Sequence, residues 1–363
     1  MGRLGLLAAA AMLAAGCGTP DRAEGYVRAF AEAQRAESAG RLAEAAARYD
    51  AAADAAKITR DRDYARHLAA LMLEHAGDRS AARERFEALG AASPRTDESA
   101  SATYEAGWMS IQHGDEAAGW HELEGVVRRF PNDGVARPAL HHLLAHTDET
   151  RGVAQSLALL RSLQDAVGNT ERGEEIAYEI AVRQARVGET PAARDALIAV
   201  AERWPYPHGA LFDNALFRAS ELDEQLGRYP EAIADLQKLL SVRESSWFTG
   251  SYERPLFDVG QMRIADLYAD RMHDDARAEA ELHKLYESFK TSLLRDRALW
   301  KEALLLERDG DHAKRCERLA TLVQDFPDSR YVPCATALCP GVTRPKTSHA
   351  PLACHRYLGA SGE

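Results

Sequence analysis

The sequence predicts an all-α fold made of about eight helical hairpins in series, each a repeat of the one before. Alanine is abundant and aromatic residues make up only 7% of the chain. Alanine-rich sequence with few β-branched runs favours helices over strands. Glycine also recurs at a fixed spacing, since Gly40, Gly77 and Gly114 are each 37 residues apart. A fixed period of this length is typical of proteins built from repeated hairpins.

The clearest copy of the hairpin turn lies around Gly227. This glycine can end a helix because it adopts a left-handed backbone at little steric cost, and Pro230 suits the first turn of the next helix. Ala232, Leu236 and Leu239 then follow at positions i, i+4 and i+7. They form one apolar stripe, which predicts that the second helix packs against its neighbours.

The same pattern recurs along the chain: a turn residue, a small residue about five positions later, and apolar residues beyond it. It marks eight turns, at Gly40, Gly77, Gly114, Gly152, Gly188, Gly227, His273 and Gly310. The unit at Gly152 is degenerate, and the last unit has Arg315 at the small position. We therefore expect a helical solenoid over residues 25–333.

Well-preserved units share an order of residues, shown by Ala193, Leu197, Val200 and the terminal Pro205. This order resembles the tetratricopeptide repeat (TPR), whose period is about 34 residues. The resemblance implies a right-handed superhelix in which the first helix of each hairpin lines an inner, concave face.

Aromatic residues recur in the predicted first helices. In the repeat frame the rings that project into the concave face are those of Phe30, Tyr64, Tyr104, Trp108, Tyr178, Phe217 and Trp300. Such a row is suited to an extended peptide or a partner helix, so we take these residues as candidate partner-binding residues. The alternative is that the rings pack between adjacent helices.

One segment disturbs the period. The step from Gly227 to His273 is 46 residues, and the excess falls near residues 241–256. Gly250 and Pro255 break helices, and Trp247, Phe248 and Tyr252 are costly to expose to water. We predict a loop that either contributes these three rings to a partner interface or packs them against the next hairpin.

The N-terminus carries an export signal. Arg3 precedes an apolar run over residues 4–15, too short to span a bilayer but suited to a secretory signal. The run ends in small residues before Cys17, which resembles the lipobox of bacterial envelope lipoproteins. The resemblance implies a signal peptide at 1–16, lipidation of Cys17, and a tether at 17–24. Gly18 after the cysteine resembles the signal for sorting to the outer membrane, facing the periplasm. A plain cleaved signal is the alternative.

The C-terminal segment 334–363 is predicted to be an irregular tail stapled by disulfides. Cys316, Cys334, Cys339 and Cys354 would be oxidised in an exported chain, and four cysteines allow three pairings. We favour Cys334 with Cys339 and Cys316 with Cys354, which would close the open end of the solenoid.

Motifs for catalysis are absent from the sequence: there is no P-loop, dinucleotide fingerprint, GxSxG or HExxH. His142 and His146 are four residues apart but lack a third ligand at a predictable spacing, so we assign no metal site. The net charge of −11 disfavours nucleic acid as a partner.

Together these features predict a non-catalytic TPR-like lipoprotein with no cofactor and no small-molecule substrate. Its expected partners are other envelope proteins, and the membrane through acyl chains on Cys17. The expected role is that of a scaffold in an outer-membrane or envelope assembly complex. A structural subunit of a secretion, motility or polysaccharide-export apparatus is the alternative, and a periplasmic enzyme or metal-binding protein is a third possibility.

Overall fold

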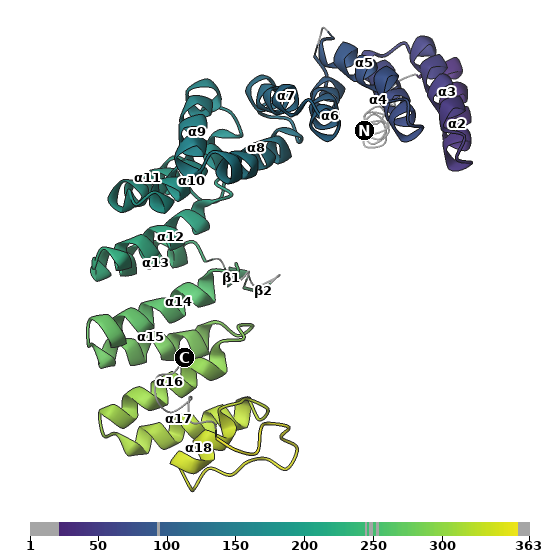
Figure 1. The fold of residues 1–363 in the computed structure, drawn as a ribbon. Coiled ribbons are helices and arrows are strands. Elements are labelled where there is room, and N and C mark those ends of the chain that lie inside the picture. The colour runs from purple at the N-terminus through teal and green to yellow at the C-terminus, as the bar shows by residue number, and fades with distance from the viewer. Residues whose placement is uncertain (1–21, 93–94, 244, 247–249, 252–253, 355–363) are drawn as a thin grey trace, which may run out of the picture. The chain divides into compact units, whose positions relative to one another are not determined.

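The computed structural model describes residues 22–92, 95–243, 245–246, 250–251 and 254–354. Within them the chain forms eight helical hairpins (Figure 1). Their helix pairs are α2 (Glu24–Ser38) and α3 (Leu42–Ala55); α4 (Thr59–His75) and α5 (Arg79–Gly90); α6 (Asp97–Gln112) and α7 (Glu116–Arg129); α8 (Ala136–Thr150) and α9 (Val153–Val167); α10 (Gly173–Arg186) and α11 (Thr190–Arg203); α12 (Phe212–Gln225) and α13 (Tyr229–Ser241); α14 (Phe257–Asp266), extended by the π-helix η1 (Leu267–Arg271), and α15 (Asp275–Ser288); α16 (Arg295–Arg308) and α17 (His312–Asp325).

The hairpins fall into two compact units, Met1–Gly173 and Glu174–Glu363. Unit 1 holds the first four hairpins, and unit 2 holds the other four and the C-terminal tail. The division lies within residues 25–333, which we predicted as one solenoid.

The turn of every hairpin lies where the sequence predicted it. All seven predicted turn glycines have positive φ, between 73° and 100°, and His273 takes the same role at φ 52°. In the turn at Gly227 the N–H of Arg228 donates to the carbonyl of Asp223, which is the bond that ends a helix in a Schellman motif. The eight-unit prediction is therefore confirmed, including the degenerate unit at Gly152.

Small residues let the two helices of a hairpin approach closely. Gly119 of α7 lies so near α6 that a Cβ added to it would stand 2.4 Å from the carbonyl oxygen of Gly107. The equivalent Ala45, Ala82, Ala193 and Ala232 are fully buried. Within unit 1, the first helix α4 also packs against the first helix α6, and the second helix α7 against the second helix α9.

The insertion before the seventh hairpin contains a short β-ladder that the sequence did not indicate. Strands β1 (Ser245–Ser246) and β2 (Gly250–Ser251) pair antiparallel, with Ser246 opposite Gly250. They lie in the chain between the end of α13 and the start of α14 (Figure 1).

The C-terminal tail begins with a helix, α18 (Val332–Leu338), where we predicted irregular structure. α18 packs on α17, and its Val332 and Ala335 join a core with Trp300 and Leu319. It therefore occupies the place of the next hairpin's first helix and covers the apolar end of the array, as a capping element must.

The disulfide pairing that we favoured is wrong. The bonds join Cys316 to Cys339 and Cys334 to Cys354. Cys334 lies in α18 and Cys339 directly follows it. Side chains five positions apart are turned by about 140° around a helix, so these two cysteines face different neighbours. Cys339 reaches α17, and Cys334 reaches the returning tail.

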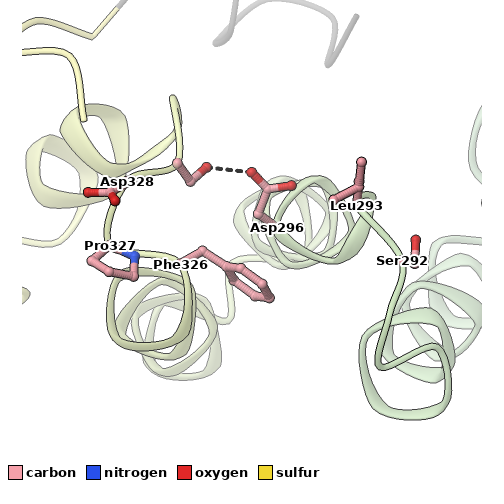
Figure 2. A pocket seen from close by; sticks show the side chains of 7 residues that line it. Ser292, Leu293, Asp296, Phe326, Pro327 and Asp328 are labelled. Atoms are coloured by element: carbon pink, nitrogen blue, oxygen red, sulfur yellow. Dashed lines mark hydrogen bonds between the residues drawn. The ribbon is translucent and has the colours of Figure 1, made fainter. Parts of the chain in front are cut away.

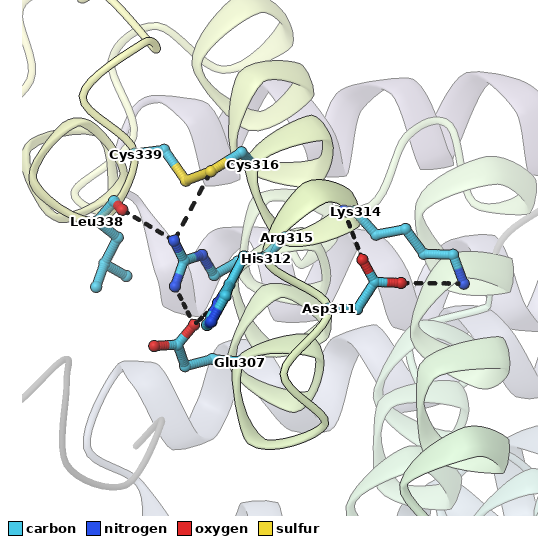
Figure 3. Close-up of a disulfide and its surroundings, with 8 residues drawn as sticks. All are labelled: Glu307, Asp311, His312, Lys314, Arg315, Cys316, Leu338 and Cys339. Atoms are coloured by element: carbon cyan, nitrogen blue, oxygen red, sulfur yellow. Dashed lines mark hydrogen bonds and ion pairs between the residues drawn. A yellow bond between two sulfur atoms is a disulfide. The ribbon is translucent and has the colours of Figure 1, made fainter.

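Arg315, which departs from the small-residue pattern, contacts the C-terminal tail. Its guanidinium forms an ion pair with Glu307 at the end of α16 and donates to the carbonyl oxygen of Leu338 at the end of α18 (Figure 3). It also lies 3.8 Å from the sulfur of Cys316. One side chain thus links the last hairpin, the tail helix and the disulfide.

No helix among the described residues has both the length and the apolar character that crossing a bilayer requires.

Candidate partner-binding surface

The first helices of unit 1, α2, α4, α6 and α8, form a surface that we name the first-helix face. Its central feature is a group of three partly exposed rings from α6 and α8. Tyr104 and Trp108 lie nearly parallel, with centroids 6.4 Å apart, and His142 approaches Trp108 at 4.7 Å and Tyr104 at 6.5 Å. We name these three residues the aromatic cluster. They come from consecutive hairpins, so the fold itself assembles the cluster.

A second aromatic group lies at the N-terminal end of the same face. Phe30 of α2 stacks on Tyr64 of α4 with centroids 6.0 Å apart, and Tyr49 of α3 packs edge-on against Phe30 at 5.2 Å. Tyr64 remains 45% exposed. Its ring therefore has a free side although it takes part in packing.

Two carboxylates accompany the rings. Glu105 follows Tyr104 in α6, and Glu74 lies near the end of the adjacent α4. Burial, and then the charge of Glu74, raises the pKa of Glu105. The pKa of Tyr104 is also raised, by burial and then by the charge of Glu105. The face thus combines aromatic surface with negative charge.

The two histidines that we considered as zinc ligands are engaged in separate ring contacts. His142 belongs to the aromatic cluster, whereas the ring of His146 stacks on Trp120 of α7 at 4.0 Å. Among the residues that the structure describes, no three His, Cys, Asp or Glu side chains gather as a metal site would require.

The candidate residues of unit 2 pack against the core of that unit. Tyr178 and Phe217 are partly buried and pack against the main core cluster of that unit. Burial raises the pKa of Tyr178, against the opposing charge of Arg218. Trp300 is 1% exposed and stacks on Tyr331 at 5.4 Å. For Trp300 the prediction of a partner-binding ring is wrong, because the tail covers it.

Three further candidates, Trp247, Phe248 and Tyr252, lie outside the described residues, as does Cys17. Their roles stay predictions.

A cleft of about 270 Å³ lies near the loop that precedes α16 and the end of α17 (Figure 2). It was not indicated by the sequence. Its acidic groups are already bonded, Asp296 to the hydroxyl of Ser329 and Asp328 to the backbone N–H of His349. One hairpin earlier, the hydroxyl of Ser292 donates in the same way to the carboxylate of Asp258, at 2.6 Å. The cleft is thus part of the linkage between successive hairpins.

Comparison with known proteins identifies one hairpin directly. Residues 297–329 match the family model described as tetratricopeptide repeat. This segment covers most of α16 and α17, which form the eighth hairpin. No curated protein matches the chain.

Several solved structures are similar to this chain at low sequence identity. A crystal structure of MamA is 17% identical and covers 51% of this chain and 94% of its own, with a TM-score of 0.35. The C-terminal part of a TPR repeat-containing protein from Cytophaga hutchinsonii is 11% identical, covering 74% and 98%, with a TM-score of 0.42. The TPR2AB domain of yeast Sti1, in its complex with pHSP90, is 15% identical, covering 72% and 89%, with a TM-score of 0.29.

At such TM-scores these structures carry no argument about function, so the classification rests on the hairpins and the matched repeat. Eight hairpins turn at the predicted residues, the small residues Ala45, Ala82, Ala193 and Ala232 are buried, and one hairpin matches the repeat family. The described chain is therefore a TPR-like array of helical hairpins whose eighth hairpin matches the tetratricopeptide-repeat family model.

Proposed function

We propose that the protein is a non-catalytic scaffold that binds protein partners through the first-helix face of unit 1. The aromatic cluster is the observation that carries this proposal. Its rings are packed against each other and so are held in place, yet they remain partly exposed. Fixed aromatic rings offer a large contact area at little entropic cost, which is why they are common at protein interfaces.

An extended segment is the form of partner that the face fits best. The cluster on α6 and α8 and the Tyr64 ring on α4 come from successive hairpins, so suitable rings are spaced along the stacking direction. An extended peptide presents alternate side chains to one surface and can contact such rings one after another.

The proposed location is the outer membrane, with the body facing the periplasm and anchored by acyl chains on Cys17. The lipobox-like sequence supports this proposal, and the two disulfides in the tail are typical of an exported chain. Mass spectrometry of the N-terminal peptide tests the lipid, and cell fractionation of Cys17→Ala tests the anchor. An unmodified Cys17, or a variant that stays with the membrane, would exclude lipid anchoring.

The proposed complex is an envelope assembly, with the residues Trp247, Phe248 and Tyr252 as a second contact. Replacing Trp247 and Phe248 with serine should reduce the recovery of cross-linked partners without changing the helical circular dichroism spectrum. Unchanged recovery would remove this segment from the interface.

Site-specific photo-cross-linking in intact cells tests the scaffold role. A benzophenone amino acid at Gln112, which is exposed in the last turn of α6, should form cross-linked products that disappear when Trp108→Ala is added. Leu293→Ala is the matched control, because it removes an apolar side chain that is 92% exposed in unit 2. Products that persist in Trp108→Ala would contradict binding at the cluster.

A further inference from the structure

A second cleft, also of about 270 Å³, lies in unit 1 beside the second helices α3 and α5. Its lining combines charged and apolar side chains, those of Asp50, Arg66, Arg85, Ala88, Leu89 and Ala92. Arg66 comes from α4, two positions after Tyr64. Residues two positions apart are turned by about 200° around a helix, so Arg66 points away from the side of α4 that carries the exposed tyrosine ring.

One of the two arginines in this cleft already holds a carboxylate. The Nη1 of Arg85 donates to both carboxylate oxygens of Asp50, at 2.5 and 2.6 Å, across the junction between the first two hairpins. The Nε and Nη2 of Arg85 make no hydrogen bond within the described part of the chain. Arg66 makes neither a hydrogen bond nor an ion pair among the same residues, although it lines the same cleft. The cleft therefore contains two guanidinium groups for one carboxylate.

The corresponding groove one hairpin later has the opposite balance of charge. Glu87 and Glu122 stand one 37-residue period after Asp50 and Arg85. The Nε of Arg83 lies 2.7 Å from the carboxylate of Glu87, and its Nη2 lies 4.0 Å from that of Glu122. Two carboxylate side chains thus share one guanidinium group in that groove. The excess of positive charge in the first groove is therefore not a general property of the repeat.

We propose that this cleft of unit 1 binds an aspartate or glutamate side chain of a protein partner, held by Arg66 and the unused donors of Arg85. A guanidinium group pairs with a carboxylate through charge-assisted hydrogen bonds. Ala88, Leu89 and Ala92 offer apolar contact to the carbon atoms beside that carboxylate. An acidic side chain is the ligand that fits, because side-chain carboxylates already meet guanidinium groups in both grooves.

The proposed acidic-side-chain site goes beyond the scaffold function proposed above and does not depend on it. Its lining comes from α3, α4 and α5, whereas the aromatic cluster lies on α6 and α8. A partner with an acidic segment can therefore occupy the cleft whether or not another segment contacts the rings.

A random-peptide array probed with the full chain tests this site without a known partner. The peptides are attached through their C-termini, so that their only carboxylates are those of aspartate and glutamate side chains. Peptides whose binding is lost in Arg66→Gln should be enriched in these two residues. Arg79→Gln is the matched control, because Arg79 is an exposed arginine of the same hairpin that does not line the cleft. It should bind the same peptides as the unaltered chain.

Affinity measurements on one selected peptide then give the size of the effect. Arg66→Gln should raise the dissociation constant by about tenfold and reduce its dependence on salt, whereas Arg66→Lys, which keeps the charge, should raise it less. Replacing the peptide's acidic residue with its amide should weaken binding to the unaltered chain but cause little further loss in Arg66→Gln, because both changes remove the same contact.

Circular dichroism establishes that each variant is folded. Arg66-dependent peptides without aspartate or glutamate would overturn the inference, as would an equal loss of binding in Arg79→Gln or the absence of any Arg66-dependent peptide. Each of these results would leave the scaffold function at the aromatic cluster intact.

Discussion

The indole of Trp108 and the imidazole of His142 pack 4.7 Å apart, centroid to centroid, across the junction between the third and fourth hairpins. This contact forms only when the two hairpins stack, because the rings come from different repeats. The stacking of the hairpins thus forms both the core and the surface through which we propose that the protein binds its partners.

Gly119 is expected to tolerate no larger residue. A Cβ at this position would stand 2.6 Å from the Ile111 side chain as well as 2.4 Å from the Gly107 carbonyl oxygen. Gly119→Ala should therefore lower the free energy of unfolding by about 1–3 kcal/mol. Urea unfolding followed by circular dichroism measures the change.

Gly125 of the same helix is the control for this prediction. There a Cβ meets only the mobile end of Arg129, at 3.3 Å. Gly125→Ala should stabilise the protein by about 0.5–1 kcal/mol, because alanine loses less backbone entropy in a helix. Equal effects at the two positions would show that helix propensity, not close approach, decides the cost.

The turn at His273 is strained relative to the other seven. An L-residue other than glycine at φ 52° costs roughly 1–2 kcal/mol. His273→Gly should thus raise the melting temperature, whereas Gly227→Ala should lower it. If thermal unfolding shows that His273→Gly is destabilising, the histidine side chain must make a contribution of its own.

Asp235 should make the protein less stable as the pH rises through the mildly acidic range. Burial raises its pKa to about 6, although Arg194 opposes the shift and Asp223 adds to it. Because the folded pKa lies above the unfolded value, the folded state holds the proton more tightly, and stability falls as pH rises from about 4 to about 6.

Asp235→Asn should remove this dependence. It keeps an oxygen that can accept from Arg194, which lies 3.3 Å from the Asp235 carboxylate. As the pH rises from about 4 to about 6, the free energy of unfolding of the variant should increase by on the order of 1–2 kcal/mol relative to that of the unaltered protein. Urea unfolding at several pH values gives the comparison, and parallel stability curves for the two proteins would rule out Asp235 as the cause.

Reduction should loosen the cap at the end of unit 2. The disulfides close loops with sequence separations of 23 and 20 residues, and each is expected to contribute about 3 kcal/mol. Dithiothreitol should make the tail sensitive to limited proteolysis and expose Trp300, which tryptophan fluorescence reports. A variant in which the four disulfide-bonded cysteines are replaced by serine should be sensitive without reductant. Resistance of that variant would show that α18 caps the array by packing alone.

Turn chemistry made most of the fold predictable. A left-handed turn needs glycine or a tolerant residue, so the spacing from Gly40 to Gly310 revealed every hairpin. The site was only partly predictable. The repeat frame placed Tyr104 and Trp108 on one helix, but it gave no means of seeing that His142 would join them or that Tyr331 would cover Trp300.

The remaining differences depend on long-range contacts that leave little trace in the local sequence. The cysteine pairing follows from the different directions in which Cys334, within α18, and Cys339, at its end, point. The sequence did not predict this helix, because Pro333 in its first turn is also typical of irregular structure.

Hydrogen–deuterium exchange of the full chain, with and without a peptide selected against it from a random display library, tests most directly whether unit 1 binds partners through its first-helix face. We expect slower exchange in α6 and α8, extending to α4, with α5 unchanged, and no such protection in Trp108→Ala. Protection confined to unit 2, including residues 241–256, would contradict it.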